Sequence, residues 1–451
     1  MGSTTNERTS VAGFFEGKSV FITGVTGFLG KALLEKLLYS CIGIDKIYVL
    51  MRPKKGLSLT ERVQNISNSL VFQRLKSNRP EDMNKIIPVT GDLSAPGLGL
   101  SAKDEEDLLN NVSVVFHSAA TVKMNEPLRV ALAVNLEGTI KVLALCKRMR
   151  NIRAFVYVST AYTNTDQQVV EERVYPPPAN IDAVYKFLRE HGDDKEATKI
   201  FLNGRPNTYS FSKSLAEAYL AEHHGDVPTV ILRPSIVGAA RSEPLAGWVD
   251  AWQGNTILQT NVARGFLRVL FCDAKVVADL IPLDCVVNMA IVSVVHSKQG
   301  KVSVYNCCTS EVNPMTWRMM SELFLRASKA DNFHKVPFPG VVMTRSPVKL
   351  AVGSFCLMTV PAYVLDAWRM VKRKPSKYRR LNRQLYILQD NIKFFTTHNW
   401  VMRSAGACAL AEALTDADAR LFPCHPAHVH WPSYMAVYYR GIKEFLCGGK
   451  K

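Results

Sequence analysis

The chain has 451 residues, of which 47% are hydrophobic, and its formal net charge at pH 7 is +17. This length and apolar content indicate a large core and more than one domain. The charge indicates an anionic partner, but neither a zinc-ligand spacing nor an aromatic–basic RNA-binding motif is present, so a phosphorylated cofactor and an anionic membrane surface are favoured over nucleic acid.

After residues 1–16, which we expect to be flexible, a predicted strand at 19–22 leads into the glycine-rich turn Thr23–Gly30. Its glycines are spaced three residues apart, and helical apolar spacing follows from residue 31. Glycines let the backbone approach a pyrophosphate, and the helix N-terminus attracts negative charge. The turn therefore predicts a dinucleotide site. Because its spacing differs from G-x-G-x-x-G, a tight turn without a ligand is the alternative.

A second predicted strand at 46–50 is followed by Met51-Arg52-Pro53-Lys54-Lys55. An NAD site usually has an acidic residue here for the ribose 2′-hydroxyl. Arg52 and Lys55 instead suit a doubly anionic 2′-phosphate. NADP(H) is therefore favoured, and a solvated basic loop is the alternative.

The third and fourth predicted strands, 86–90 and 112–117, also end in residues suited to a cofactor. Asp92 follows the third strand and either reaches the adenine edge or caps a turn. Ser118-Ala119-Ala120 follow the fourth strand, where small side chains let a cofactor pass closely. His117 is predicted to be a packed or ribose-side residue rather than a catalytic base.

After a predicted helix at 135–150, a fifth strand at 154–158 delivers Ser159 and Thr160 at its carboxyl end. Ligands of open α/β sheets bind at that end of the strands. Residues 164–204 are a long polar excursion, which we expect to form a surface lobe over the site.

Tyr209 and Lys213 are four residues apart at the start of the next predicted helix and share one face. A neighbouring cation favours the phenolate, so we expect Lys213 to lower the pKa of Tyr209 below its ordinary value near 10. A Ser or Thr hydroxyl on the neighbouring strand can bond the substrate oxygen. The chain has a second Y-x-x-x-K match, Tyr439 to Lys443, which we interpret as a surface helix pair.

Further strands are predicted at 229–238 and 302–306, and residues 279–288 indicate a turn and a helix start. Residues 350–365 then carry no charge and are followed by Trp368 and a polybasic segment. This order indicates membrane attachment with the basic side cytosolic, either as a span or as a monotopic insertion. A buried helix followed by a solvated basic loop is the alternative.

Taken together, these motifs resemble the fatty acyl-CoA reductase family of the extended short-chain dehydrogenase/reductase superfamily, over nearly the whole chain from about Phe14. The glycine and Tyr/Lys motifs alone indicate only the superfamily, whereas the apolar segment and the stretch after it specify the family. The resemblance rests on Gly24/Gly27/Gly30, Arg52-Pro53-Lys54-Lys55-Gly56, Gly91-Asp92-Leu93-Ser94, His117-Ser118-Ala119-Ala120, Tyr209-Ser210-Phe211-Ser212-Lys213, Leu232-Arg233-Pro234-Ser235-Ile236-Val237-Gly238, Ile281–Asn288 and Phe394–Trp400.

The resemblance implies an α/β fold, with a Rossmann-like doubly wound parallel sheet and a substrate lobe. We expect a flexible N-terminus over 1–16 and an NADP-binding reductase domain over 17–330. A membrane-associating segment over 345–370 would precede a basic segment and a small helical C-terminal domain over 371–451.

The activity that the resemblance implies is NADPH-dependent reduction of long-chain fatty acyl-CoA to a primary alcohol, through an aldehyde and with release of CoA. Thr160 and Tyr209 would stabilise the oxyanion, Tyr209 would donate the proton, and Lys213 would orient the ribose. Thr160 matches the superfamily's hydroxyl, although Ser159 is one residue away. The implied cofactor-binding residues are Thr23, Gly24, Thr26, Gly27, Phe28, Leu29, Gly30, Arg52, Lys55, Asp92, Leu93, Ala119, Ala120, Asn135, Tyr209, Lys213, Pro234 and Ile236. No metal site is expected.

The expected partners are a long-chain acyl-CoA and a membrane surface or bilayer, and a homodimer is also considered. No C-x-x-C pair and no signal peptide are found, so we expect reduced thiols and a cytosol-facing protein on the endoplasmic reticulum, peroxisome or lipid droplet. The alternatives are another membrane-associated extended short-chain reductase, such as a sterol or aldehyde-forming enzyme, and a non-catalytic NADP-binding membrane scaffold.

Overall fold

The computed structural model describes residues 10–53 and 56–448, and it divides the chain into two compact units. Unit 1 takes in the chain up to Ser235 together with Leu283–Cys308 and Arg403–Pro426. Unit 2 consists of Ile236–Pro282, Thr309–Met402 and the chain from Ala427. The two units are therefore interleaved in sequence, which differs from the consecutive domains 17–330 and 371–451 that the sequence suggests.

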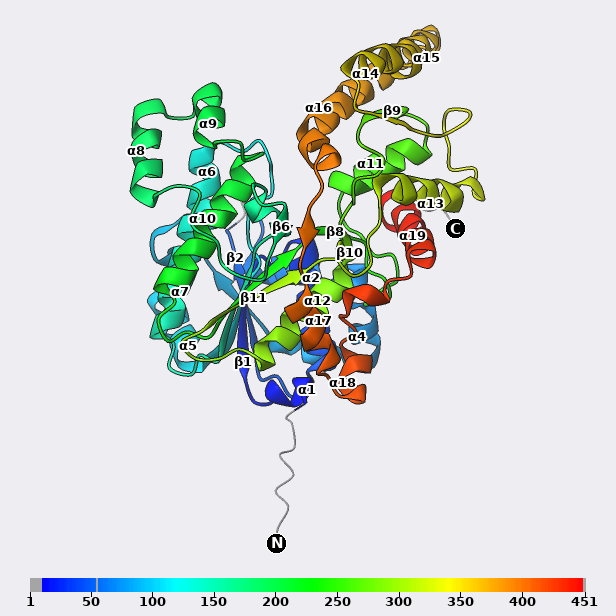
Figure 1. Ribbon diagram of the computed structural model, residues 1–451. Coiled ribbons are helices and arrows are strands. Elements are labelled where there is room, and N and C mark those ends of the chain that lie inside the picture. Colours follow the sequence, from blue (N-terminus) through cyan, green and yellow to red (C-terminus); the bar gives the residue numbers. More distant parts are fainter. Residues whose placement is uncertain (1–9, 54–55, 449–451) are drawn as a thin grey trace. The chain divides into compact units, whose positions relative to one another are not determined.

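Unit 1 contains a seven-stranded parallel sheet whose strand order is β11-β7-β5-β4-β1-β2-β3 (Figure 1). Each of these strands lies where the sequence predicts one, and the doubly wound α/β fold is confirmed. The order reverses at β1, whose neighbours are β2 and β4, and ligands of such sheets bind at this switch point. The strands are β1 (Ser19–Thr23), β2 (Ile47–Met51), β3 (Ile86–Thr90), β4 (Val112–His117), β5 (Ala154–Val158), β7 (Thr229–Pro234) and β11 (Val302–Cys307).

Helices cover both faces of this sheet, with α5, α7 and α10 on one face and α2 and α12 on the other (Figure 1). Alternate strand residues such as Phe21 and Phe155 pack with Val142 of α7 and Leu215 of α10 in one apolar core. The helices of unit 1 are α1 (Val11–Phe14), α2 (Phe28–Ser40), α3 (Leu59–Ser67), α4 (Gln73–Asn78), α5 (Ala102–Asn111), α6 (Leu128–Leu132), α7 (Gly138–Arg148), α8 (Ile181–His191), α9 (Lys195–Phe201), α10 (Thr208–His223), α12 (Leu283–Val295), α17 (Ala405–Glu412) and α18 (Asp416–Leu421).

Part of the lead that the sequence predicts to be flexible is helical. Ser10 caps α1 through its hydroxyl, which accepts from the Gly13 N–H at 3.0 Å. The Val11 N–H donates to the Asp418 carboxylate at 3.2 Å, and the Val11 side chain is buried. Residues 11–14 are therefore held in place by α18, which lies about 400 residues later in the chain. A contact between such distant segments cannot be predicted from local sequence.

Glu172 links residues 403–426 to the rest of unit 1, because it joins three segments of the chain. Its carboxylate accepts the N–H groups of Asn306 and Ala407, each at 3.0 Å, and that of Gly406. A carboxylate at a helix N-terminus is stabilised by the helix dipole, and here the helix is α17. The polar excursion after β6 (Val169–Val170) is thereby fixed to the edge strand β11 as well as carrying α8 and α9.

Unit 2 contains two short parallel strand pairs and a set of helices. β8 (Ile236–Gly238) pairs with β10 (Leu280–Pro282), and β9 (Val269–Phe271) pairs with β12 (Val342–Thr344). The expected turn at 279–288 is thus strand β10 followed directly by α12 of unit 1. The remaining elements of unit 2 are α11 (Gly254–Ala263), α13 (Trp317–Lys329), α14 (Pro347–Ser354), α15 (Val360–Val371), α16 (Tyr378–Thr397), β13 (Val401–Met402) and α19 (Trp431–Gly441).

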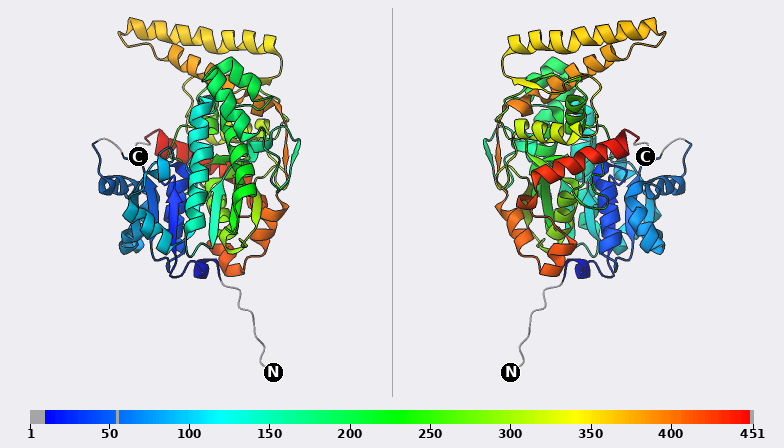
Figure 2. Two further views of the ribbon diagram at one scale, coloured as in Figure 1. Left: turned by 90° about the vertical axis from the view of Figure 1, so that its left-hand side faces the viewer. Right: turned by 90° about the vertical axis from the view of Figure 1, so that its right-hand side faces the viewer.

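α14 and α15 form one continuous helix over Pro347–Val371, joined by a π-helical turn at Phe355–Thr359, and we call this helix the rod (Figure 2). Among the described residues, the rod is the one helix long and apolar enough to cross a membrane. Of its most apolar stretch, 17% is buried. The apolar segment predicted at 345–370 is therefore a helix whose side chains are mostly exposed, and not a helix of a closed core.

Candidate functional site

The glycine-rich turn crosses the loop after β4 at a distance that only glycine permits. Gly24 has φ +80°, and a Cβ atom there would lie 2.6 Å from the Ala119 nitrogen. A Cβ on Gly30 would lie 2.2 Å from the Gly24 carbonyl oxygen. Gly27 is the N-cap of α2, which starts at Phe28. The result is a cradle without side chains at a helix N-terminus, which is the geometry that a pyrophosphate requires.

Thr23 links the ends of β1 and β4 through its hydroxyl and through its carbonyl, which accepts from the Ser118 hydroxyl at 2.8 Å. The Thr23 Oγ1 atom lies 2.6 Å from His117 Nδ1 and accepts from the Ala119 N–H at 3.3 Å. His117 is fully buried, and its Nε2 lies 3.1 Å from the hydroxyl of Thr139. Burial, together with a smaller effect of the charge of Lys213, lowers the pKa of His117 to about 3. The imidazole is neutral at pH 7 and packed, as the sequence indicates.

The end of β2 and the loop after β3 hold the residues expected around an adenosine. Arg52 is exposed directly after β2, and Lys55 lies outside the described residues. Asp92 Oδ1 accepts from the N–H and the hydroxyl of Ser94, at 2.9 and 2.7 Å, so this oxygen caps a turn. Leu93 is buried beside Gly138. Of the two readings of Asp92, the turn cap is the one with partners in the structure.

The residues expected to be catalytic lie at the carboxyl end of β5 and in the first turns of α10. Asn207 caps α10 by accepting the Ser210 N–H at 2.8 Å, which places Tyr209 in the first turn. The Thr160 side chain hydrogen-bonds Tyr209. The Ser159 hydroxyl is buried and has no hydrogen-bond partner among the described residues. The geometry thus pairs Tyr209 with Thr160 rather than with Ser159.

Lys213 is 2% exposed, and its ammonium donates to the Val158 carbonyl at 2.7 Å and lies 4.4 Å from the centre of the Tyr157 ring. Burial lowers the pKa of Lys213 to about 7, while the charge of Glu217 acts in the opposite direction. Lys213 therefore extends from α10 to the end of β5, next to the Thr160 segment.

The pKa of Tyr209 moves in the direction opposite to the one expected from sequence. Burial raises the pKa of Tyr209 to about 12, although the hydrogen bond from Thr160 opposes the rise. Loss of hydration disfavours a phenolate, and Lys213 is itself too deeply buried to hold a full charge at neutral pH. Spacing along a helix identifies the neighbouring cation but does not reveal its desolvation.

A buried ion pair behind Tyr209 and Lys213 is missed by the sequence reading. Arg233 of β7 donates to both Glu217 oxygens, at 2.9 and 2.6 Å. It also donates to the carbonyls of Glu171 and Arg173, at 3.1 and 2.9 Å. Tyr209, Lys213 and Glu217 follow one another at four-residue intervals on α10. This spacing, with an arginine in an otherwise apolar strand, was the available signal.

The other residues expected to bind the cofactor lie on several elements. Ala119 and Ala120 form the loop that Gly24 crosses, and Pro234 ends β7. Asn135 is buried, and its amide bonds the Thr121 backbone at 3.0 and 3.1 Å and the Ser212 hydroxyl at 3.0 Å, so it braces the loop against α10. Ile236 starts β8 and belongs to unit 2. Thr26 and Leu29 lie on the glycine-rich turn and the first turn of α2.

The second Y-x-x-x-K match lies in unit 2 and bonds an aspartate. Tyr439 donates to Asp331 Oδ2 at 3.0 Å, and the Lys443 ammonium lies 3.0 Å from the same oxygen. Lys443 is exposed, whereas the Tyr439 side chain is 2% exposed, so only the lysine matches the surface pair that we expected. Within residues 10–53 and 56–448, no group of three or more His, Cys, Asp or Glu side chains could hold a metal ion.

Comparisons with known proteins match the chain over nearly its whole length. An NAD-binding family model described as "Male sterility protein" matches residues 22–290, and a second model with the same description matches residues 357–448. Fatty acyl-CoA reductase 1 of Rattus norvegicus is 34% identical over 97% of this chain and 86% of its own length. Fatty acyl-CoA reductase 2 of Mus musculus is 33% identical with the same coverage.

Among solved structures, the fold is similar to the reductase (R) domain of a nonribosomal peptide synthetase from Mycobacterium tuberculosis. The TM-score is 0.66 at 18% sequence identity, and the match covers 96% of this chain and 92% of that domain. At this identity the likeness shows a shared fold.

Proposed function

The chain belongs to the fatty acyl-CoA reductase family, and from this premise we propose that it reduces long-chain fatty acyl-CoA to a primary alcohol with NADPH, through an aldehyde. A nicotinamide cofactor and a reductase fold follow from the family. The observation that carries the proposal is the cluster of Thr160, Tyr209 and Lys213 at the same sheet edge as the glycine cradle.

The residues present fit a dinucleotide. Gly24 and Gly30 keep side chains out of the cradle, and the N-terminus of α2 provides N–H groups and the positive end of a dipole. Arg52 supports NADPH over NADH, since an exposed guanidinium after β2 can bind a 2′-phosphate through paired hydrogen bonds. Lys213 would hold the nicotinamide ribose hydroxyls.

When bound, NADPH supplies the hydride for each of the two reductions. Thr160 and Tyr209 would donate hydrogen bonds to the carbonyl oxygen of the thioester, where negative charge develops, and CoA would leave as the carbonyl re-forms. In the second reduction, Tyr209 would donate its proton to the oxygen of the aldehyde. A raised pKa keeps Tyr209 protonated at neutral pH, which suits a proton donor.

The exposed apolar rod supports attachment to a membrane. An acyl-CoA with a long chain partitions into lipid, so an enzyme at the membrane surface meets its substrate there. The cytosolic face of the endoplasmic reticulum, peroxisome or lipid droplet fits this substrate, and fatty alcohol biosynthesis is the corresponding role. Assembly as a homodimer is also compatible with the proposal.

The test is NADPH oxidation by detergent-solubilised protein with a panel of acyl-CoA chain lengths, with NADH in parallel and products separated by chromatography. We expect alcohol and free CoA from long-chain substrates, with faster turnover on NADPH than on NADH. Aldehyde without alcohol would limit the enzyme to the first reduction. Cofactor binding without product from any acyl-CoA would contradict the proposal and favour the scaffold alternative.

A further inference from the structure

The rod, Pro347–Val371, is apolar around most of its circumference but covered along one narrow stripe. The structure describes every residue of the rod. The buried ones are Ser354, Met358, Ala362 and Asp366, which follow one another at four-residue intervals. Exposed large apolar side chains occupy the rest of the surface: Val348, Val352, Phe355, Val360, Val364 and Trp368. Val364 is 62% exposed and Trp368 58% exposed. An apolar surface of this extent marks an interaction site.

The covered stripe of the rod faces α16, which folds back along α15 as a hairpin (Figure 2). The Asp366 carboxylate accepts the N–H groups of Lys377, Tyr378 and Arg379 at 2.8 to 3.0 Å and so caps α16. Farther along, the Asn382 amide donates to the Thr359 hydroxyl at 3.1 Å. These contacts fix the first half of α16 to the second half of the rod.

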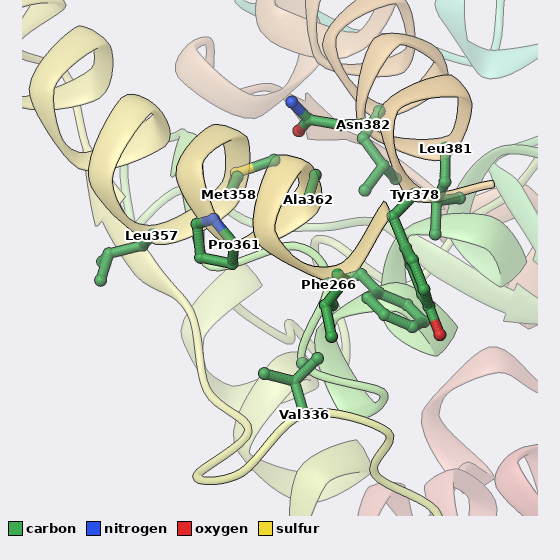
Figure 3. A pocket seen from close by; sticks show the side chains of 12 residues that line it. Phe266, Val336, Leu357, Met358, Pro361, Ala362, Tyr378, Leu381 and Asn382 are labelled. Carbon is green, nitrogen blue, oxygen red and sulfur yellow. The ribbon is translucent and has the colours of Figure 1, made fainter. Parts of the chain in front are cut away.

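An apolar groove continues the exposed surface beneath the hairpin (Figure 3). Leu357 and Pro361 of the rod line one side, and Tyr378 and Leu381 of α16 line another. Phe266 and Val336 come from the part of unit 2 outside the hairpin, namely the loop after α11 and the loop before β12. Phe266 and Val336 thus bring the rest of unit 2 against the hairpin near Leu357, Pro361 and Tyr378.

Both ends of the hairpin return to the same strand, β9. The strand that precedes the rod, β12, pairs with β9. At the end of α16, the Thr396 hydroxyl donates to the Phe271 carbonyl of β9 at 2.7 Å. A helix that crosses a bilayer leaves its two flanking segments on opposite sides. Here the segments before and after the hairpin meet on one strand, so a single crossing would require this packing to break.

The turn of the hairpin is the most basic part of the segment. Lys372, Arg373, Lys374 and Lys377 lie in the turn, and Arg379, Arg380 and Arg383 follow on α16; all seven are exposed. A hairpin inserted tip first would bring these cations into hydrocarbon, where each costs about 2.5–3.5 kcal/mol at mid-bilayer depth. Headgroup phosphates instead attract exposed Lys and Arg.

Crossing and tip-first insertion are thus both opposed, by the return to β9 and by the charge of the turn. Building on the membrane attachment suggested under the proposed function, we propose that the rod docks lengthwise into one leaflet of an anionic phospholipid membrane. Its exposed apolar side chains lie at the level of the upper acyl chains. The cations of the turn and of α16 bind the phosphates of the same leaflet. Both ends of the rod face the cytosolic side.

The binding test is flotation of the full chain with phosphatidylcholine vesicles that do or do not contain phosphatidylserine. We expect binding that depends on phosphatidylserine and weakens with salt. Val364→Glu should lower the bound fraction about tenfold or more, because a carboxylate enters the acyl layer. Ile200→Glu is the control, since Ile200 is an apolar residue of α9 in unit 1 that is even more exposed than Val364, at 79%. Equal loss from both variants would overturn the proposal.

The topology test uses a membrane-impermeant maleimide on vesicle-bound protein. Lys349→Cys and Lys374→Cys each place a thiol at one end of the rod, in a Cys356→Ser background that removes the exposed cysteine between them. Docking in one leaflet predicts labelling of both positions from outside. Labelling of one position, with protection of the other until detergent is added, would show a crossing and overturn the proposal.

Three further results separate this inference from its alternatives. Reduction of acyl-CoA in detergent should be unchanged by Val364→Glu, so loss of vesicle binding with retained turnover reports on docking alone. An inactive wild-type protein that still binds vesicles would contradict the proposed function and leave the docking intact. A change of molar mass in light scattering, without any vesicle binding, would show instead that the rod pairs with a second copy of the chain.

Discussion

The candidate active-site region of unit 1 and the rod of unit 2 depart from the usual distribution of side chains in opposite ways. In unit 1, Arg233 is fully buried, and Glu217 and Lys213 are each 2% exposed. On the rod, Val348, Val364 and Trp368 are more than half exposed. Charged groups are almost never buried unless they are paired, and large apolar patches are rarely left exposed.

The two regions satisfy their unusual side chains in different ways. The buried charges of unit 1 are compensated internally, by an ion pair and by carbonyl oxygens, so this region is complete within the folded chain. The rod has no compensating cover along most of its circumference within its own unit. Its apolar surface is satisfied only by a partner, which we take to be lipid. The predictions below test this contrast with matched pairs of residues.

The largest effect is expected when the same Y-x-x-x-K motif is altered in each unit. Tyr209→Phe should lower kcat by about 10²–10⁴-fold through loss of the proton donor, with little change in the KM for acyl-CoA. Tyr439→Phe removes a hydroxyl that bonds Asp331 and should leave kcat unchanged. Steady-state kinetics in detergent compares the two. A similar loss of kcat from both would mean that Tyr209 acts through folding and not through the reaction.

The second prediction compares two ion pairs of equal length. Arg233→Met leaves Glu217 buried without its partner and should destabilise β7 by about 3–5 kcal/mol. Lys393 and Asp390 of α16 also lie 2.6 Å apart, but both are exposed, so Lys393→Met should cost less than about 1 kcal/mol. Hydrogen exchange of the amides around each pair measures the local opening free energy. Arg233→Met with Glu217→Leu should recover part of the loss, and no recovery would argue against an unpaired charge as the cause.

The third prediction compares exposed arginines of the two units. Arg52→Ala should weaken NADPH binding by about 10- to 100-fold, since a charge-assisted hydrogen bond contributes about 1.5–3 kcal/mol, and should leave NADH binding unchanged. Arg380→Ala should leave the Kd for NADPH unchanged and reduce binding to phosphatidylserine vesicles. Fluorescence titration with both cofactors gives the dissociation constants. Equal weakening of NADPH and NADH by Arg52→Ala would remove the support for a 2′-phosphate site.

The smallest effect is a pH dependence that unit 1 should have because Lys213 is buried. The pKa of Lys213 is about 7 in the cofactor-free protein. Ribose hydroxyls that accept from the ammonium favour its charged form and raise that pKa on binding. Above pH 7 the protein must then take up a proton to bind, so the Kd for NADPH should rise by up to about tenfold per pH unit.

Lys213→Met serves as the control for this dependence. Its NADPH affinity should be lower at all pH values but should change little between pH 7 and pH 9. Isothermal titration in two buffers of different ionisation enthalpy would reveal the proton uptake by the wild type. The same pH slope in Lys213→Met would assign the dependence to another group.

The sequence was sufficient for the sheet of unit 1 because its strands are short apolar runs bounded by turns. The seven strands of this sheet were all predicted, and Gly24 and Gly30 were recognised because their conformational requirement is local. The strand-end rule placed Thr160 at the edge where ligands bind, whereas its pairing with Tyr209 of α10 was an expectation from the family resemblance. Features that depend on residues close in sequence, or on sheet topology, could thus be predicted from the sequence.

Features that depend on desolvation or on contacts between distant segments could not be predicted from the sequence. The pKa of Tyr209 was expected to fall because Lys213 was counted as a full charge, whereas burial determines the direction for both groups. The pairing of Arg233 with Glu217 joins a strand to a helix, and neither residue stands in a motif that requires the other. The composition of the rod indicated an apolar helix, but only its contacts with α16 and β9 distinguish docking from crossing.

The hydrogen bonds by which Glu172 joins three segments of the chain have a consequence for biosynthesis. Unit 1 is completed by α17, whose N-terminus binds the Glu172 carboxylate, and by Pro423, whose carbonyl accepts from the Asn288 amide at 3.1 Å. A ribosome must therefore synthesise nearly the whole chain before α12 and β11 gain their last partners. Until then, this face of the sheet unit lacks the cover of α17, so unit 1 cannot be completed before the segment up to Pro426 has been made.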